Sequence, residues 1–298
     1  MARRLTVVLA CAACVTLIAA QSSSTSTTHP LRYIALGDSF SSGEGDPPYR
    51  EASNRYLPPF DICHRSYHAY PQLVAGRRSS PGTWSFWACS GARLVDMTHP
   101  NRENPVEKPQ LDRIAAPAKS DPSVDLITLT IGGNDAQFNV VWLGCLASHL
   151  AAPLTGSCAG NWRAFVSAAI QRLRNALPAV FRGMRARAPN ARILVLGYPD
   201  PFPAVLPQVS RCNLWFAPSD IRWLAQQAVA LNSAIEAAAK AAAAGITYVP
   251  PSGFVGHDVC SHDPWFNPIE LGPSRIRGSF HPNVVGQRQL AREVLAHL

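Results

Sequence analysis

The chain has 298 residues, of which 27 are Lys or Arg and 19 are Asp or Glu, giving a formal net charge of +8. The basic residues are dispersed rather than gathered in blocks with aromatic residues, so no nucleic-acid partner is expected. The excess is compatible with a weak, transient attraction to anionic lipid or envelope surfaces. Hydrophobic residues make up 47% of the chain, enough for one large core, and we expect a single domain.

The N-terminus has the pattern of an export signal. Two arginines precede an apolar run, Leu5–Ala20, which ends in small residues and is too short to cross a bilayer comfortably. We therefore expect a secretory signal peptide over residues 1–20, a polar segment over 21–30 and one folded domain over 31–298. An uncleaved membrane anchor is one alternative. A lipoprotein is another, because the apolar run contains two cysteines.

Five short apolar segments predict strands: 32–36, 83–87, 125–131, 192–196 and 246–249. Residues 161–187 repeat apolar side chains at a period of 3.6, and a kink is expected at Pro178. A second helix is expected from a cap at Ser219 to about Ala244, and a last one over 283–298. Strands that alternate with helices indicate an α/β fold, with a mostly parallel sheet covered on both faces.

Long Pro- and aromatic-rich connections separate these elements, at 46–62, 97–122, 136–160, 198–218 and 250–280. Connections of this length are usually functional or disordered. Six cysteines follow the signal: Cys63, Cys89, Cys145, Cys158, Cys212 and Cys260. An even number in an exported chain predicts disulfides, although the residues alone leave the pairing open. Since none has the C-x-x-C spacing of a zinc site, no structural metal is expected.

A serine stands where the first predicted strand gives way to small residues. The run IALGDSFSSG, residues 34–43, places Ser39 just beyond the strand end. Open α/β sheets carry their sites at the carboxyl ends of strands, so this hydroxyl is a candidate nucleophile. A serine in such a place more often only caps a turn or helix.

Three further groups could act together with this serine. The third predicted strand leads into GGND at 132–135, where Asn134 offers an amide donor, and the second leads to Gly91, whose N–H is unobstructed. His281, in SFHPN at 279–283, is a candidate general base before the last helix. Each alone is usually a turn or surface residue. Together with a serine they are the minimum set for acyl transfer.

The chain resembles the SGNH, or GDSL-type, hydrolase superfamily over residues 30–298. The motifs that carry the resemblance follow the family's order: GDSFS at 37–41, Gly91, GGND at 132–135 and HPN at 281–283. The likeness is greatest to secreted actinobacterial esterases and lipases with three disulfides. It implies a three-layer α/β/α, flavodoxin-like fold and the sequential pairing Cys63–Cys89, Cys145–Cys158 and Cys212–Cys260.

The resemblance also implies ester hydrolysis without a cofactor. Ser39 would attack the carbonyl and His281 would take its proton. The oxyanion would be held by the N–H groups of Ser39 and Gly91 and by the side chain of Asn134.

One position departs from the family pattern. The family usually has Asp three residues before the histidine, where this chain has Gly278. We expect the backbone carbonyl of Gly278 to orient His281. Asp258 and Asp263, in the preceding connection, are the alternatives.

The implied enzyme is a secreted monomer that hydrolyses acyl glycerols, phospholipids or short-to-medium acyl esters. A carbohydrate O-deacetylase of the acetylxylan type and a non-catalytic envelope-binding protein are the other readings. A metal-dependent hydrolase using the His- and Asp-rich segment 256–263 is a rival, although such residues are commonly part of turns. Apolar loop residues could line an acyl site or pack beneath the loops: Phe138, Trp142, Leu143, Trp215, Phe216, Trp265 and Phe266.

Overall fold

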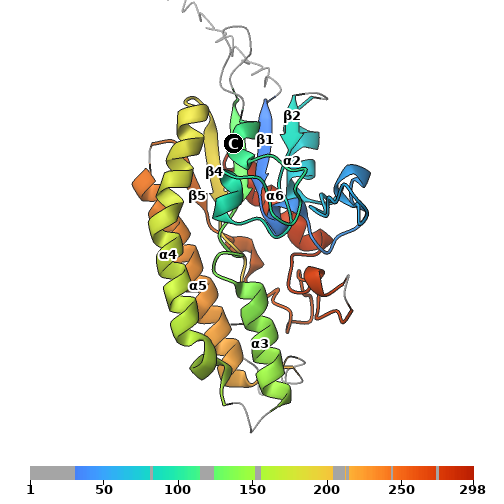
Figure 1. The fold of residues 1–298 in the computed structure, drawn as a ribbon, viewed down its shortest axis with the longest axis vertical. Coiled ribbons are helices and arrows are strands. Elements are labelled where there is room, and N and C mark those ends of the chain that lie inside the picture. Colours follow the sequence, from blue (N-terminus) through green and yellow to red (C-terminus); the bar gives the residue numbers. More distant parts are fainter. Residues whose placement is uncertain are drawn as a thin grey trace, which may run out of the picture.

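Figure 1 shows a computed structural model of the chain, which describes residues 31–80, 83–114, 124–151, 156–203, 212, 215–242, 244–272 and 275–298. The expected signal peptide and polar segment lie outside these residues. Within the described ranges, no helix is both long enough and apolar enough to cross a membrane.

Five strands form one parallel sheet in the order β2-β1-β3-β4-β5. Their bounds are Tyr33–Gly37 (β1), Trp84–Phe86 (β2), Leu126–Thr130 (β3), Arg192–Leu196 (β4) and Ile246–Val249 (β5). All residues of β1 and β3 are buried, which explains their mainly apolar sequence. The five predicted strands and their parallel arrangement are therefore confirmed.

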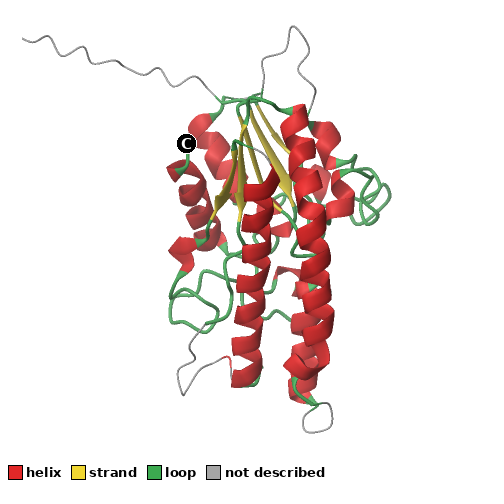
Figure 2. Ribbon diagram, turned by 90° about the vertical axis from the view of Figure 1, so that its left-hand side faces the viewer, coloured by secondary structure: helices red, strands yellow, loops and turns green. Residues whose placement is uncertain are grey.

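Helices cover both faces of this sheet, as Figure 2 shows. Among the described residues, the α-helices are Ser39–Ser42 (α1), Tyr70–Arg78 (α2), Phe138–Leu150 (α3), Cys158–Arg187 (α4), Pro218–Ala242 (α5) and Val284–Ala296 (α6). Helix α2 packs with α6, and α4 packs with α5. The strand order reverses direction after β2, so right-handed crossovers place α2 on the face opposite α4 and α5. The three-layer α/β/α expectation is confirmed.

The predicted helices differ from the observed ones mainly at their ends. Helix α4 starts three residues early, because the Ser157 side chain accepts a hydrogen bond from the Gly160 N–H, and it continues through Pro178. Helix α5 begins at Pro218, which places Ser219 inside the first turn rather than at the cap. Helix α6 begins one residue after the predicted start, because Asn283 caps it by accepting from two backbone N–H groups.

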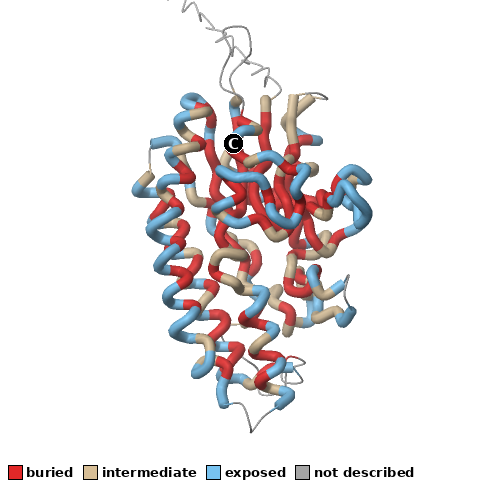
Figure 3. Tube along the Cα trace, in the orientation of Figure 1, coloured by how far each residue is buried: buried red, intermediate tan, exposed pale blue. Residues whose placement is uncertain are grey.

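The connection expected over 136–160 contains helix α3. Apolar residues occur around most of its circumference, so the sequence shows no clear 3.6 period. Figure 1 shows α3 beside the parts of α4 and α5 that extend past the carboxyl ends of the strands. In Figure 3 the buried residues concentrate in the sheet and on the inner sides of the helices. Helix α3 thus forms a wall over the sheet edge where the motif residues lie.

Candidate active site

Ser39 stands at a sharp turn between β1 and α1. Gly37 has a φ of +117°, and a Cβ there would lie 2.4 Å from the carbonyl oxygen of Thr130, so a larger residue would not fit. Asp38 then caps α1 by accepting a hydrogen bond of 3.1 Å from the Phe40 N–H. Ser39 is the first helical residue and is 7% exposed. The turn holds its hydroxyl at the carboxyl edge of the sheet.

The carboxyl group of Asp38 joins the first and third motifs. It accepts a 2.6 Å hydrogen bond from the Thr130 hydroxyl and a second one from the Tyr198 hydroxyl. Tyr198 in turn accepts from the Gly133 N–H at 2.9 Å. Burial raises the pKa of Asp38 to about 7. In the sequence, Asp38 and Tyr198 are marked only by their place next to a strand end, which predicts no role for either.

His281 meets Ser39 directly. Its Nε2 lies 2.7 Å from Ser39 Oγ, and its Nδ1 lies 3.2 Å from the carbonyl oxygen of Ser279. Burial lowers the pKa of His281, while the charge of Glu44 and the carbonyls of Ser279 and Gly278 act in the opposite direction. The imidazole can therefore accept the serine proton at Nε2 and keep its Nδ1 proton toward the backbone.

The carbonyl support includes a residue that sequence reasoning missed. We expected the Gly278 carbonyl to orient the ring, and it accepts the His281 backbone N–H at 3.2 Å. The Nδ1 hydrogen bond itself is made to Ser279. No sequence pattern distinguishes these carbonyls, because the choice depends on how the chain turns before the histidine.

Two further candidate oxyanion donors, Gly91 and Asn134, share a cleft with Ser39. Gly91 has a φ of +81° and lines a cleft that Ser39 and His281 also line. The Asn134 amide lines the same cleft and donates to the carbonyl of Ala92 at 3.0 Å. Because an amide nitrogen carries two protons, this bond leaves one proton of Asn134 for a ligand.

Asp258 and Asp263, the carboxylates considered as alternatives to the Gly278 carbonyl, bind other groups. Asp258 accepts from the Cys260 N–H at 2.8 Å, and Asp263 lies 3.2 Å from Nδ1 of His257. The His257 ring stacks on Trp265. These contacts are those of turn residues in the segment 256–263. In the described part of the chain, metal-ligating atoms gather at Asp61, Cys63 and Glu107, where Cys63 is already in a disulfide.

Two pockets open from the Ser39 hydroxyl. The first, of about 100 Å³, is mainly apolar and runs between the sheet edge, α3 and α5. Its far wall is formed by Phe138, Trp142, Phe202, Leu224, Ala228 and Leu231. The second, of about 180 Å³, is a more polar cleft whose charged lining residues are Arg93, Glu103 and Arg277. The site therefore offers one apolar and one charged side to a substrate.

Some of the apolar loop residues named above line the pockets, and others pack away from them. Phe138 and Trp142 line the apolar pocket, and Leu143 lines the polar cleft. Phe216 packs behind the site against Phe202 and Phe280. The remaining three are not among the residues that line either pocket: Trp215, Trp265 and Phe266.

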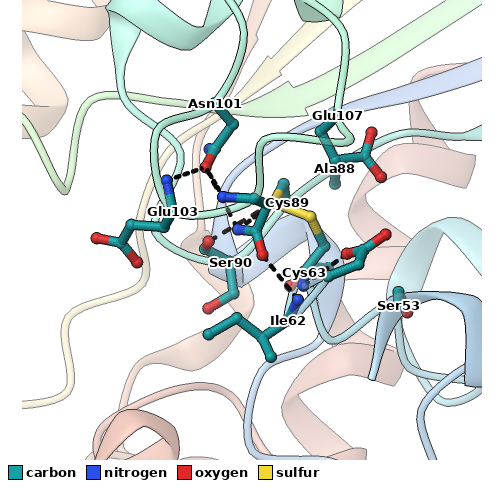
Figure 4. The surroundings of a disulfide bond; sticks show 12 residues. Ser53, Ile62, Cys63, Ala88, Cys89, Ser90, Asn101, Glu103 and Glu107 are labelled. Carbon is teal, nitrogen blue, oxygen red and sulfur yellow. Dashed lines mark hydrogen bonds between the residues drawn. A yellow bond between two sulfur atoms is a disulfide. The ribbon is translucent and has the colours of Figure 1, made fainter. Parts of the chain in front are cut away.

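Three disulfides fasten the connections, in the pairing that the resemblance implies: Cys63–Cys89, Cys145–Cys158 and Cys212–Cys260. Figure 4 shows the first of them, next to Ser90 and below Asn101. The Ser90 N–H also donates to the Cys63 carbonyl at 3.0 Å. This disulfide thus holds the loop that carries Gly91 against the segment that follows α1.

Known proteins support this assignment from sequence and structure. The profile of the GDSL-like Lipase/Acylhydrolase family matches residues 35–289. The chain is 33% identical to Lipase 2 of Streptomyces coelicolor over 279 residues, which are 90% of this chain and 86% of that protein. It is also 33% identical to a lipase of Streptomyces rimosus, over 86% of this chain and 82% of that protein.

Solved structures agree with these sequence matches. The extracellular lipase of Streptomyces rimosus superposes with a TM-score of 0.70 at 28% identity, over 89% of this chain and 99% of that one. Phospholipase A1 of Streptomyces albidoflavus NA297 gives a TM-score of 0.69 at 29% identity, over 89% and 98%. The protein is a carboxylic ester hydrolase that belongs to the GDSL-like lipase/acylhydrolase family.

Proposed function

We propose that the protein hydrolyses lipid esters through an acyl-enzyme on Ser39, with His281 as base. The observation that carries this proposal is the 2.7 Å contact between Ser39 Oγ and His281 Nε2, at the mouth of an apolar pocket. As Ser39 attacks the ester carbonyl, its proton passes to Nε2 of His281. The same proton then goes to the leaving alcohol, and water attacks the acyl-enzyme in a second, equivalent step.

The negative charge that develops on the carbonyl oxygen must be stabilised by hydrogen-bond donors. We assign these to the backbone N–H groups of Ser39 and Gly91 and to the side-chain amide of Asn134. During proton transfer the imidazolium of His281 is held by the carbonyl of Ser279, with that of Gly278 beside it. Backbone carbonyls thus orient the His281 ring, which an Asp usually does in this family.

The pocket favours an acyl chain over an acetyl group. An acetyl group would leave part of a 100 Å³ apolar space bounded by Phe138, Trp142 and Phe202 empty. A longer acyl chain buries its first methylenes there, each contributing roughly 0.8 kcal/mol. The alcohol part then lies in the polar cleft, beside Arg93 and Arg277. This arrangement supports a glyceride or phospholipid substrate over an acetylated polysaccharide.

The place of action follows from the N-terminal pattern and the disulfides. We propose that residues 1–20 direct export, that the mature protein acts outside the cell as a monomer, and that its basic charge brings it transiently to lipid or envelope surfaces. Analytical ultracentrifugation and N-terminal sequencing of the culture protein test the monomer and the cleavage.

A chain-length series of p-nitrophenyl esters tests the function, with acetylated xylan, a triglyceride and a phosphatidylcholine vesicle run beside it. We expect kcat/KM to rise from acetyl toward medium chains, and Ser39→Ala to lose at least about 10³-fold activity while it unfolds at the same temperature. A preference for acetate and xylan would replace this proposal with the O-deacetylase. Equal activity of Ser39→Ala and the wild type would remove the enzyme mechanism.

A further inference from the structure

A second carboxylate lies buried close to the catalytic pair. Glu44 follows α1, is 2% exposed, and donates its backbone N–H to the Ser39 carbonyl at 3.0 Å. Its side chain accepts from His64 Nδ1 at 2.7 Å and from the hydroxyls of Tyr49, at 3.4 Å, and Ser90. Burial acts to raise the pKa of Glu44, but the hydrogen bond and charge of His64, the charge of His281 and the hydrogen bond from Ser90 keep that pKa below its ordinary value. The group is therefore an anion inside the protein.

The partner histidine is fixed at both ring nitrogens. His64 is buried, stacks on the Tyr49 ring, and has its Nε2 2.9 Å from the Tyr56 hydroxyl. Its Nδ1 lies 2.7 Å from Glu44, so the ring holds the carboxylate in one place.

Glu44 lies against the segment that supports His281. A Cβ at Gly278 would lie 2.8 Å from the Cα of Gly45, so the residue after Glu44 packs tightly on the carbonyl turn before the histidine. On the other side, Ser90 precedes Gly91. The Glu44 carboxylate thus contacts the residue before Gly91, its backbone contacts Ser39, and the next residue packs on the turn before His281.

Two other charged groups near the catalytic pair, Asp38 and Arg277, have their own partners. Asp38 is bound by Thr130 and Tyr198, and Arg277 pairs with Glu103 at 3.6 Å where both are largely exposed. Glu44 is the charged side chain whose field raises the pKa of His281 against the effect of burial. An anion in a dry site acts over several ångströms because little water screens it.

We propose that Glu44 is a positioning residue whose buried charge stabilises the His281 imidazolium during catalysis, replacing from a distance the Asp that is absent at Gly278. This inference rests on the proposed roles of Ser39 and His281. The serine proton still moves to Nε2, and Glu44 neither takes nor gives a proton in the step.

The test compares Glu44→Gln with the wild type by two measurements. Gln keeps the size of the side chain and an acceptor for His64, but removes the charge. In ¹⁵N-histidine-labelled protein without substrate, we expect the His281 titration midpoint to fall by about 0.5–1 pH unit, and kcat to fall about three- to tenfold. We expect KM for a p-nitrophenyl ester to stay within about twofold, because Glu44 lines neither pocket.

Two variants control for a merely structural effect. Asp46→Asn alters a carboxyl group that is two residues further on and 4% exposed; because burial raises the pKa of Asp46 to about 7, this variant changes the packing with little change of charge, and we expect it to leave the His281 midpoint in place. Glu44→Asp keeps the charge and should restore the wild-type midpoint even if its shorter side chain lowers the unfolding temperature.

An unchanged His281 midpoint in Glu44→Gln overturns the proposal, and so does an equal shift in Asp46→Asn. If the loss of kcat equals the loss of sites that react with a phosphonate inhibitor, Glu44 only maintains the fold. Failure of the proposed function is a separate result, because it is seen as absence of Ser39-dependent turnover in the wild type. The NMR titration does not depend on that turnover.

Discussion

The Nε2 atom of His281 lies 2.7 Å from the Oγ of Ser39, although 242 positions separate the two residues in the sequence. The first strand delivers Ser39 to the carboxyl edge of the sheet, and the segment before the last helix delivers His281 to the same edge. Because both lie beside an apolar pocket, proton transfer and acyl binding occupy one place.

The acid limb of the pH profile should report His281. Burial lowers its pKa, so the imidazole is a free base at neutral pH and loses activity only when it is protonated on acidification. We expect kcat/KM for a soluble ester to fall below pH 7 with a midpoint under about 6.5, the ordinary histidine value. A midpoint well above that value would contradict the burial of the ring.

Asn134→Ala should remove one oxyanion donor. We expect kcat to fall by about 10²–10³-fold with little change in KM, since the donor acts on charge that develops only in the transition state. Asn139 lines the same two pockets and provides the matched control, Asn139→Ala. Equal losses in the two variants would mean that the amide at 134 has no special part.

Asp258→Asn and Asp263→Asn should each be nearly silent in catalysis. Their contacts are to Cys260 and His257, whereas His281 is held by backbone carbonyls. We expect kcat within about threefold of the wild type, as for changes outside the reacting groups. A drop of several orders of magnitude in either variant would show that a carboxylate supports His281 after all.

Removal of the Cys63–Cys89 disulfide should affect both stability and rate. The bond closes a segment of sequence separation 26, and such cross-links contribute about 2–4 kcal/mol to the free energy of unfolding. Urea unfolding of Cys63→Ala/Cys89→Ala measures this loss. We also expect a lower kcat, because Ser90 and Gly91 adjoin the bond.

The control for that experiment is the pair Cys145→Ala/Cys158→Ala. This disulfide joins α3 to the start of α4, away from the oxyanion loop. Removing it should lower the free energy of unfolding by a similar amount but leave kcat for a short ester unchanged. If both pairs reduce kcat equally, the effect comes from general loosening of the fold.

The elements that the sequence predicted best are those with a strong local pattern. Strands β1 and β3 are apolar runs buried on both faces, and α6 has an asparagine cap whose preference depends on neighbouring N–H groups alone. Helix α3 is not predicted because its apolar residues occur on all sides of the helix, which hides the 3.6 period. The predicted start of α5 is displaced because Pro218 and Ser219 both suit a first turn.

For the site, the sequence by itself determined which groups are available: a serine after β1, a glycine after β2, an asparagine after β3 and a histidine before α6. Motif order and residue type suffice for this, since parallel strands bring their carboxyl ends to one edge. Only the tertiary structure decided what surrounds them. The Ser279 carbonyl at His281, the Asp38–Tyr198 link and the Glu44–His64 pair all join segments distant in sequence. Such contacts depend on how long loops pack, and no local pattern encodes that packing.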